Sequence, residues 1–77
     1  MIINGHKVTQ KNEVGEVAYM EIDDGKAEFV NVAGLGISGT AWDAEQKKII
    51  QETLPNVKFQ PHPNEDGLEA WKFYGTP

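Results

Sequence analysis

Carboxylates are the most concentrated chemically active groups in this sequence. Six of them and one lysine give residues 13–28 a charge of −5, which equals the formal net charge of the whole 77-residue chain. The five that we take as a candidate acidic partner-binding face are Glu16, Glu21, Asp23, Asp24 and Glu28. Paired carboxylates can perform acid–base chemistry, but the sequence around these residues offers no apolar pocket to tune them. Asp23-Asp24-Gly25 is also too short for a calcium loop, because no glutamate closes it.

The acidic stretch therefore has two interpretations. The simpler one is the solvated tip of a hairpin. The functional one is a surface that docks on a basic groove of another protein, since opposite potentials steer such an encounter.

Nucleophiles and metal ligands are poorly supported. No histidine or carboxylate is placed in the sequence to activate Ser38, Thr40 or Thr53, so a catalytic triad is not expected. Cysteine is absent, and His6 and His62, which we expect at the surface, are the only imidazoles. We expect no metal site, no cofactor and no enzymatic activity, and keep a small enzyme as the weakest of three hypotheses.

A glycine motif supplies the main alternative function. Residues 34–39 read Gly-Leu-Gly-Ile-Ser-Gly, a G-x-G-x-x-G pattern between a predicted strand and a predicted helix. These six residues resemble the phosphate turn of dinucleotide-binding folds. The acidic ribose ligand of that family is missing near residue 60, and 77 residues are too few for its repeated βα units. The alternative is a small module that holds a phosphate or nucleotide at the helix N-terminus with Gly34, Gly36, Ser38, Gly39 and Thr40; a glycine-rich crossover or bulge would be the structural explanation.

Aromatic residues near the end of the chain form a third candidate surface. They are Trp71, Phe73 and Tyr74, with Trp42 and His62 as expected neighbours. Such residues pack in a core or at an edge, or serve as interface anchors where they are exposed.

Composition limits the class of protein. The length fits one domain spanning residues 1–77. No apolar run approaches the roughly 18 residues of a membrane span, and the N-terminal residues lack the basic start and apolar core of a secretory signal, so we expect a cytoplasmic protein. Arginine is absent and the net charge is −5, so we expect no direct nucleic-acid binding.

Turn signals divide the N-terminal half into strands. Asn4-Gly5 predicts a hairpin over residues 1–10, followed by a turn at 11–15. Strands are expected at 16–22 and 27–33 around a turn at 23–26. In the second of these strands the two-residue period places Phe29 on one face and Val30 on the other. We expect Met20 to pair with Val30, because the competing register sets Glu21 against Glu28.

The second half contains the one clear helix. Asp43 with Gln46 predicts a helix start, and Pro55 predicts its end near residue 54. The residues that recur at helical spacing and predict its core-facing stripe are Trp42, Gln46, Ile49, Ile50, Thr53 and Leu54. Short strands are expected at 57–60 and 68–74, with a stiff loop over 61–67. The predicted fold is α+β, in the order β(β)-β-β-α-β-β, with the helix (about 43–54) on one face of a four- to five-stranded, mainly antiparallel sheet. Strands 27–33 and 57–60 would form one parallel pair.

These observations favour a small acidic, non-enzymatic binding protein that acts by protein–protein interaction. The expected partner is a host or cognate protein with a basic surface, and a homodimer is a further alternative. Small acidic chains of this kind are typical of phage or mobile-element inhibitors of host proteins, such as nucleic-acid-binding defence or transcription factors.

Overall fold

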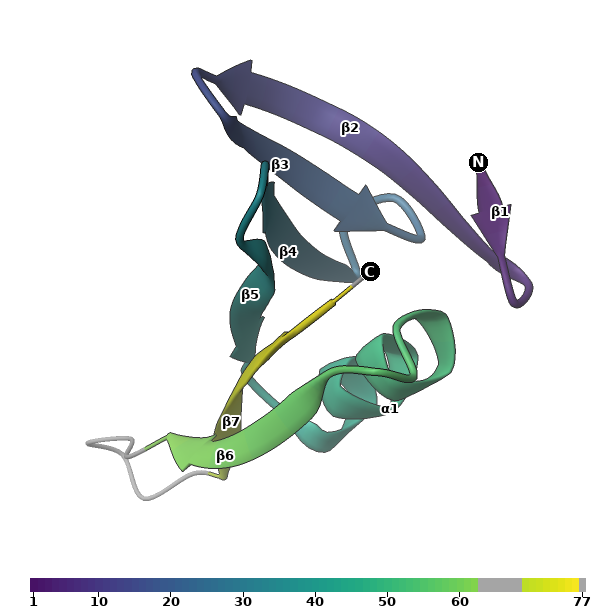
Figure 1. Ribbon diagram of the computed structural model, residues 1–77. Helices are drawn as coiled ribbons and strands as arrows, with labels where there is room; N and C mark the ends of the chain where they lie inside the picture. Colours follow the sequence, from purple (N-terminus) through teal and green to yellow (C-terminus); the bar gives the residue numbers. More distant parts are fainter. Residues whose placement is uncertain (63–68, 77) are drawn as a thin grey trace.

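The protein is α+β, with one helix and a seven-stranded antiparallel sheet in the part of the chain that the structure describes (Figure 1). The computed structural model describes residues 1–62 and 69–76. In chain order the elements are β1 (Ile2–Ile3), β2 (His6–Val14), β3 (Val17–Ile22), β4 (Ala27–Val32), β5 (Gly36–Ala41), α1 (Ala44–Thr53), β6 (Lys58–His62) and β7 (Ala70–Gly75).

The sheet has more strands than the sequence predicted, and no parallel pair among those described. Its spatial order is β1-β2-β3-β4-β5-β7-β6, and every neighbouring pair is antiparallel. The prediction of four to five strands is wrong for two reasons. Most of the stretch 34–40, expected to interrupt regular structure, belongs to the inner strand β5, and the first hairpin contributes two strands, β1 and β2. The parallel pair is also wrong, because β7 lies between β5 and β6 and leaves β6 at the edge of the sheet.

The N-terminal hairpin is confirmed, but its second strand is longer than predicted. Asn4 and Gly5 have φ of 50° and 86°, the left-handed pair that a two-residue hairpin turn requires. β2 then continues to Val14, so the predicted turn at 11–15 is wrong, and the chain reverses at residues 15–16 instead. The pairing of β2 with β3 shifts register between Gln10 and Asn12, as at a β-bulge, where one strand has an extra residue.

The β3–β4 register differs from the prediction. Met20 faces Phe29, Ile22 faces Ala27, and Glu21 faces Glu28, the arrangement that like charges disfavour. Burial explains the outcome, because this register places Ile22 and Ala27, 0% and 2% exposed, together in the core. The two glutamates point to the opposite face of the sheet.

The helix forms as predicted, and two reciprocal hydrogen bonds cap its N-terminus. The Asp43 side chain accepts a hydrogen bond from the Gln46 backbone N–H at 2.8 Å, and the Gln46 side chain accepts one from the Trp42 N–H at 2.9 Å. Leu54 is the C-cap residue. Of the predicted stripe, Ile49, Ile50, Thr53 and Leu54 are buried, Gln46 is half-buried, and Trp42 is 56% exposed.

One face of the sheet carries the hydrophobic core. The buried side chains that pack together are Val8, Ile22, Ala27, Phe29, Ile37, Ala41, Ile49, Ile50, Leu54 and Phe73. α1 packs on this face against β4 and β5. A single helix leaves the opposite face of the sheet uncovered by any described element.

The last strand is confirmed over Ala70–Gly75. Leu68, its predicted first residue, lies outside the described residues, as do residues 63–67 of the predicted loop. Pro61 and His62 belong to β6.

Candidate functional site

The uncovered side of the sheet, which we call the open face, is the main candidate site. Side chains alternate between the two faces of a strand, so the neighbours of buried Phe29, Ile37 and Phe73 point away from α1. The open face therefore carries these residues of the central strands: Tyr19, Glu21, Glu28, Val30, Ser38, Thr40, Lys72 and Tyr74.

Several exposed apolar side chains gather on this face. Among the described residues, seven large hydrophobic side chains are exposed. Four of them belong to the open face or its borders: Val14, Tyr19, Trp42 and Tyr74. Apolar side chains that are exposed together indicate an interaction site, whereas single exposed apolar residues are common on any protein surface.

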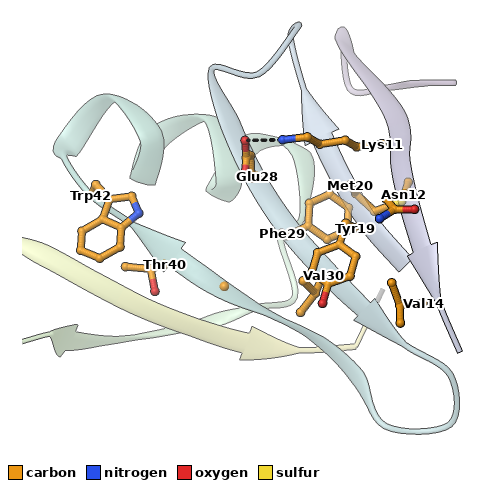
Figure 2. Close-up of a pocket in the computed structure, with 11 residues that line it drawn as sticks. Lys11, Asn12, Val14, Tyr19, Met20, Glu28, Phe29, Val30, Thr40 and Trp42 are labelled. Atoms are coloured by element: carbon orange, nitrogen blue, oxygen red, sulfur yellow. Dashed lines mark ion pairs between the residues drawn. The ribbon is translucent and has the colours of Figure 1, made fainter. Parts of the chain in front are cut away.

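A shallow hollow of about 510 Å³ lies on the open face (Figure 2). Trp42 and Thr40 lie at one end and Val14 at the other, with Tyr19 and Val30 between them. Its lining residues are Lys11, Asn12, Val14, Tyr19, Met20, Glu28, Phe29, Val30, Gly39, Thr40 and Trp42. Mostly apolar walls with few charged groups suit an apolar side chain better than a phosphate.

One ion pair borders the hollow. The ammonium Nζ of Lys11 lies 3.9 Å from Oε1 of Glu28, and both side chains are mostly exposed. An exposed pair of this length contributes little to stability, so both groups are available to a partner.

The five predicted acidic residues do not form one surface. Glu16 lies at the β2–β3 turn, and Asp23 and Asp24 lie at the β3–β4 turn, at the other end of the six-residue strand β3. At about 3.3 Å per residue, these turns are roughly 20 Å apart. Asp24 is bonded to Lys7 at 3.1 Å, so part of the charge is satisfied within the chain. Glu21 and Glu28 are the members that lie on the open face.

The three predicted aromatic residues are also divided between faces. Phe73 is a core residue that is 1% exposed, whereas Tyr74 is 45% exposed on the open face. Trp71 is partly buried, and the Nζ of Lys47 lies 4.4 Å from its ring centroid. Trp42 and His62, expected as neighbours of these three residues, contact each other, with ring centroids 5.6 Å apart and edge-to-face geometry.

The glycine motif forms a hairpin turn and a strand, in place of the predicted loop. Gly34 turns the chain with a φ of 79°, and Gly36, Ser38, Gly39 and Thr40 belong to β5. β5 lies between β4 and β7, so its backbone takes part in ladders on both sides. The helix N-terminus follows two residues after β5 and is capped by Asp43. This geometry lacks the strand–loop–helix turn that cradles a phosphate.

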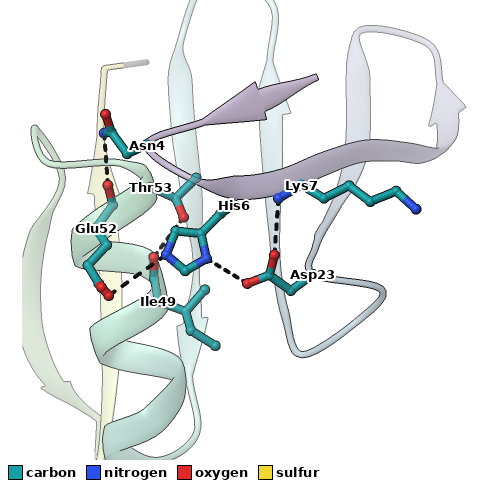
Figure 3. A network of polar contacts seen from close by, with 7 residues as sticks. All are labelled: Asn4, His6, Lys7, Asp23, Ile49, Glu52 and Thr53. Atoms are coloured by element: carbon teal, nitrogen blue, oxygen red, sulfur yellow. Dashed lines mark hydrogen bonds and ion pairs between the residues drawn. The ribbon is translucent and has the colours of Figure 1, made fainter.

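A polar cluster that the sequence analysis missed joins the first hairpin to the helix (Figure 3). Nδ1 of His6 lies 2.6 Å from Oδ2 of Asp23, and Nε2 of His6 lies 3.7 Å from Oε1 of Glu52. The other Asp23 oxygen accepts the Lys7 backbone N–H at 3.0 Å, and the Asn4 amide donates to the Glu52 carbonyl at 2.9 Å. The only signal in the sequence was a histidine and an aspartate next to two turns.

The electrostatics of this cluster are mutual. The hydrogen bond with Asp23 raises the pKa of His6 above 6.5, against a smaller opposing effect of desolvation. The hydrogen bond with His6 lowers the pKa of Asp23 below 3.8, with a further contribution from the Lys7 N–H. No serine or threonine hydroxyl is bonded to His6 in the described residues, and the Thr53 hydroxyl donates to the Ile49 carbonyl. The cluster, which we call the clasp, therefore connects the first hairpin to the β3–β4 turn through Asp23 and to the helix through Glu52.

Metal and membrane sites find no support in the residues that the structure describes. Residues 1–62 and 69–76 contain no group of three or more histidine or acidic side chains placed to hold a metal ion. Within the same ranges, no helix is long and apolar enough to cross a membrane. Comparison of the chain with protein-family models, with curated proteins and with solved structures finds no match.

Proposed function

We propose that this chain is a non-enzymatic binding protein that acts by protein–protein interaction through its open face. The observation that carries the proposal is the concentration of exposed apolar side chains around the hollow, on the side of the sheet that α1 does not cover. Tyrosine and tryptophan beside a pocket are typical anchors of protein interfaces.

The chemistry of the hollow defines what a partner must supply. Tyr19, Val30 and Trp42 favour an apolar or aromatic side chain. Glu28 at the border and Glu21 beside it favour a lysine or arginine of the partner. The basic partner surface expected from the sequence fits this requirement, with the contact at the open face and not at the hairpin tips. A host protein as the target stays a prediction.

Matched surface variants test the proposal. Tyr19→Ser removes an aromatic group from the hollow, whereas Leu35→Ser removes an apolar group that is exposed even more, 86% against 42% for Tyr19, at the β4–β5 turn. Affinity capture with the parent and both variants identifies bound proteins, and titration calorimetry with the purified partner measures each Kd. We expect Tyr19→Ser to weaken binding at least tenfold, about 1.4 kcal/mol, and Leu35→Ser to leave it unchanged. Equal affinities for the parent and Tyr19→Ser would refute the role of the open face.

A further inference from the structure

Side chains on the open face form a row whose order follows from the strand pairing. Tyr19 of β3 is the Cα partner of Val30, which is the partner of Ser38 in β5. On the other side Ser38 is the partner of Tyr74 in β7, which is the partner of Lys58 in β6. The row therefore places the small side chain of Ser38 in the middle, with one tyrosine on each side of β5.

A second row, one step along the strands, carries opposite charges on its two sides. Thr40 of β5 is the Cα partner of Lys72 in β7. On the β4 side, Glu28 lines a small hollow together with Thr40. Glu21 is the partner of Glu28 and extends the negative side onto β3. The open face therefore carries Glu21 and Glu28 on β3 and β4, with Lys11 of β2 at 3.9 Å from Glu28, and it is basic over β7 and β6, where Lys58 and Lys72 lie.

This arrangement is self-complementary. We infer that the partner of the open face is a second copy of this chain; the inference rests on the proposed function. The two copies are related by a two-fold axis that is parallel to β5 and lies above the open face, between the two sheets. A half-turn about such an axis exchanges β4 with β7 and β3 with β6. It sets Glu28 of each copy against Lys72 of the other, and Val30 against Tyr74, as a closed two-fold interface requires.

The pairs that result are chemically favourable. Tyr74 of one copy enters the hollow of the other, beside Tyr19 and Val30. Lys58 faces Tyr19 of the other copy, where an ammonium group is attracted to an aromatic ring. The small side chains of Ser38 and Thr40 lie near the axis and let the two sheets approach to about 10 Å, the spacing of a β-sandwich.

A dimer interface of ordinary size needs only a small part of the exposed surface. A specific interface buries about 800 Å² on each partner, roughly one sixth of the 5149 Å² that this chain exposes. The net charge of −5 opposes association of two copies over longer distances. At about 0.15 M salt the screening length is roughly 8 Å, so this repulsion is weakened more than the direct contacts are.

Charge reversal with self-rescue tests the inference. Sedimentation equilibrium of the full chain at 0.15 M salt is expected to show a mass that rises with concentration from 8.5 kDa towards twice that value. Glu28→Lys and Lys72→Glu should each weaken the dimer at least tenfold, because each places like charges together twice. The double variant Glu28→Lys/Lys72→Glu restores opposite charges and should regain most of the parent affinity.

Controls match each change in net charge away from the open face. Lys48→Glu on α1 changes the charge by the same amount as Lys72→Glu, and Glu45→Lys matches Glu28→Lys; both positions are exposed on the helix. We expect neither control to alter the dimer constant by more than about twofold. Circular dichroism verifies that each variant is folded. If a charge-reversed variant is not folded, the neutral variant Glu28→Gln or Lys72→Gln replaces it and is expected to weaken the dimer less.

Two results would overturn the inference. One is a monomer mass for the parent at every concentration up to about 1 mM, a limit that corresponds to a binding free energy of about 4 kcal/mol. The other is a dimer that the swaps at residues 28 and 72 affect no more than the helix controls do. If the chain is monomeric while Tyr19→Ser still loses a captured partner, only the identity of the partner is wrong. If Tyr19→Ser also has no effect on capture, the proposed function fails as well.

Discussion

Replacing Gly39 with alanine should destabilise the fold through one specific contact. Gly39 and Phe73 face each other across β5 and β7, and the Phe73 side chain is 1% exposed. A Cβ atom built on Gly39 would lie 2.4 Å from Cζ of Phe73 and 3.0 Å from Cε1 and Cε2. The ring must therefore move, and Phe59, whose ring centroid lies 5.7 Å away, limits where it can go.

The expected magnitude follows from overpacking. Inserting one methyl group into a packed core typically costs about 1–3 kcal/mol, because neighbouring side chains leave their preferred rotamers. A domain of this size loses about 4–8 °C of Tm for each kcal/mol, so a loss of about 2 kcal/mol lowers the Tm by roughly 8–16 °C.

A double-mutant cycle measures the contact. Urea unfolding monitored by tryptophan fluorescence gives the free energy of unfolding of four proteins: the parent, Gly39→Ala, Phe73→Leu and the double variant. Leucine is shorter than phenylalanine and leaves room for the new methyl group, so the double variant should be more stable than the sum of the single changes predicts, by about 0.5–3 kcal/mol. Ser38→Ala, an exposed neighbour, serves as the control. An unfolding midpoint for Gly39→Ala equal to that of the parent, or strict additivity, would refute this account.

Three further predictions concern the clasp, the helix cap and the cation over Trp71. Asp23→Asn should return the pKa of His6 towards 6.5 in an NMR titration; because that pKa is raised in the folded state, the stability gained from the charged pair is full below pH 6.5 and is lost as the pH rises through the folded pKa. Asp43→Ala removes the bond to the N–H of residue 46 and should lower stability by about 1 kcal/mol in thermal unfolding. Lys47→Met keeps the aliphatic stem but loses the cation over Trp71, and should cost about 0.5–1 kcal/mol and change the tryptophan emission.

Each of these changes has a neighbouring control. Asp24→Asn should leave the pKa of His6 unchanged, since Asp24 bonds to Lys7. Glu45→Gln, in the first turn of the helix, should cost only a few tenths of a kcal/mol. Lys48→Met should leave the tryptophan emission as it is. Any control that matches the effect of its test variant would contradict the contact assigned to it.

Lower pH tests the other half of the clasp. The pKa of Asp23 is depressed, so its contribution is present above pH 3.8 and is lost as the pH falls through the folded pKa. The difference in unfolding free energy between the parent and Asp23→Asn should therefore shrink below pH 3.8. A difference that stays constant from pH 6 to pH 2 would show that the carboxylate is not held by His6.

The features that were predicted correctly depend on neighbouring residues. Asn4-Gly5 requires left-handed backbone at two adjacent positions, and Asp43 caps the N–H of a residue three positions away. The helical spacing of Ile49 and Ile50 likewise identified the buried stripe. For the site, two-residue alternation separated Phe29 from Val30 and indicated that one face of the sheet carries the core.

The features that were missed depend on residues far apart in the chain. β5 forms where local glycines suggested a loop, because Phe73 packs over Gly39 and β7 supplies its second ladder. The β3–β4 register, with Glu21 opposite Glu28, follows from the burial of Ile22. The open face also depends on the position of β7 between β5 and β6, because this position places Lys72 and Tyr74 beside β5.

The amino-acid sequence by itself therefore determined the turns at residues 4–5 and 23–26, the helix, its cap and the α+β class, because each depends mainly on contacts within a few residues. Only the tertiary structure decided the strand order, the register, the clasp between His6 and Asp23, and which side chains share the uncovered face. The physical reason is that burial and strand pairing are settled between distant segments, where a favourable core can override a local like-charge contact or a glycine-rich run.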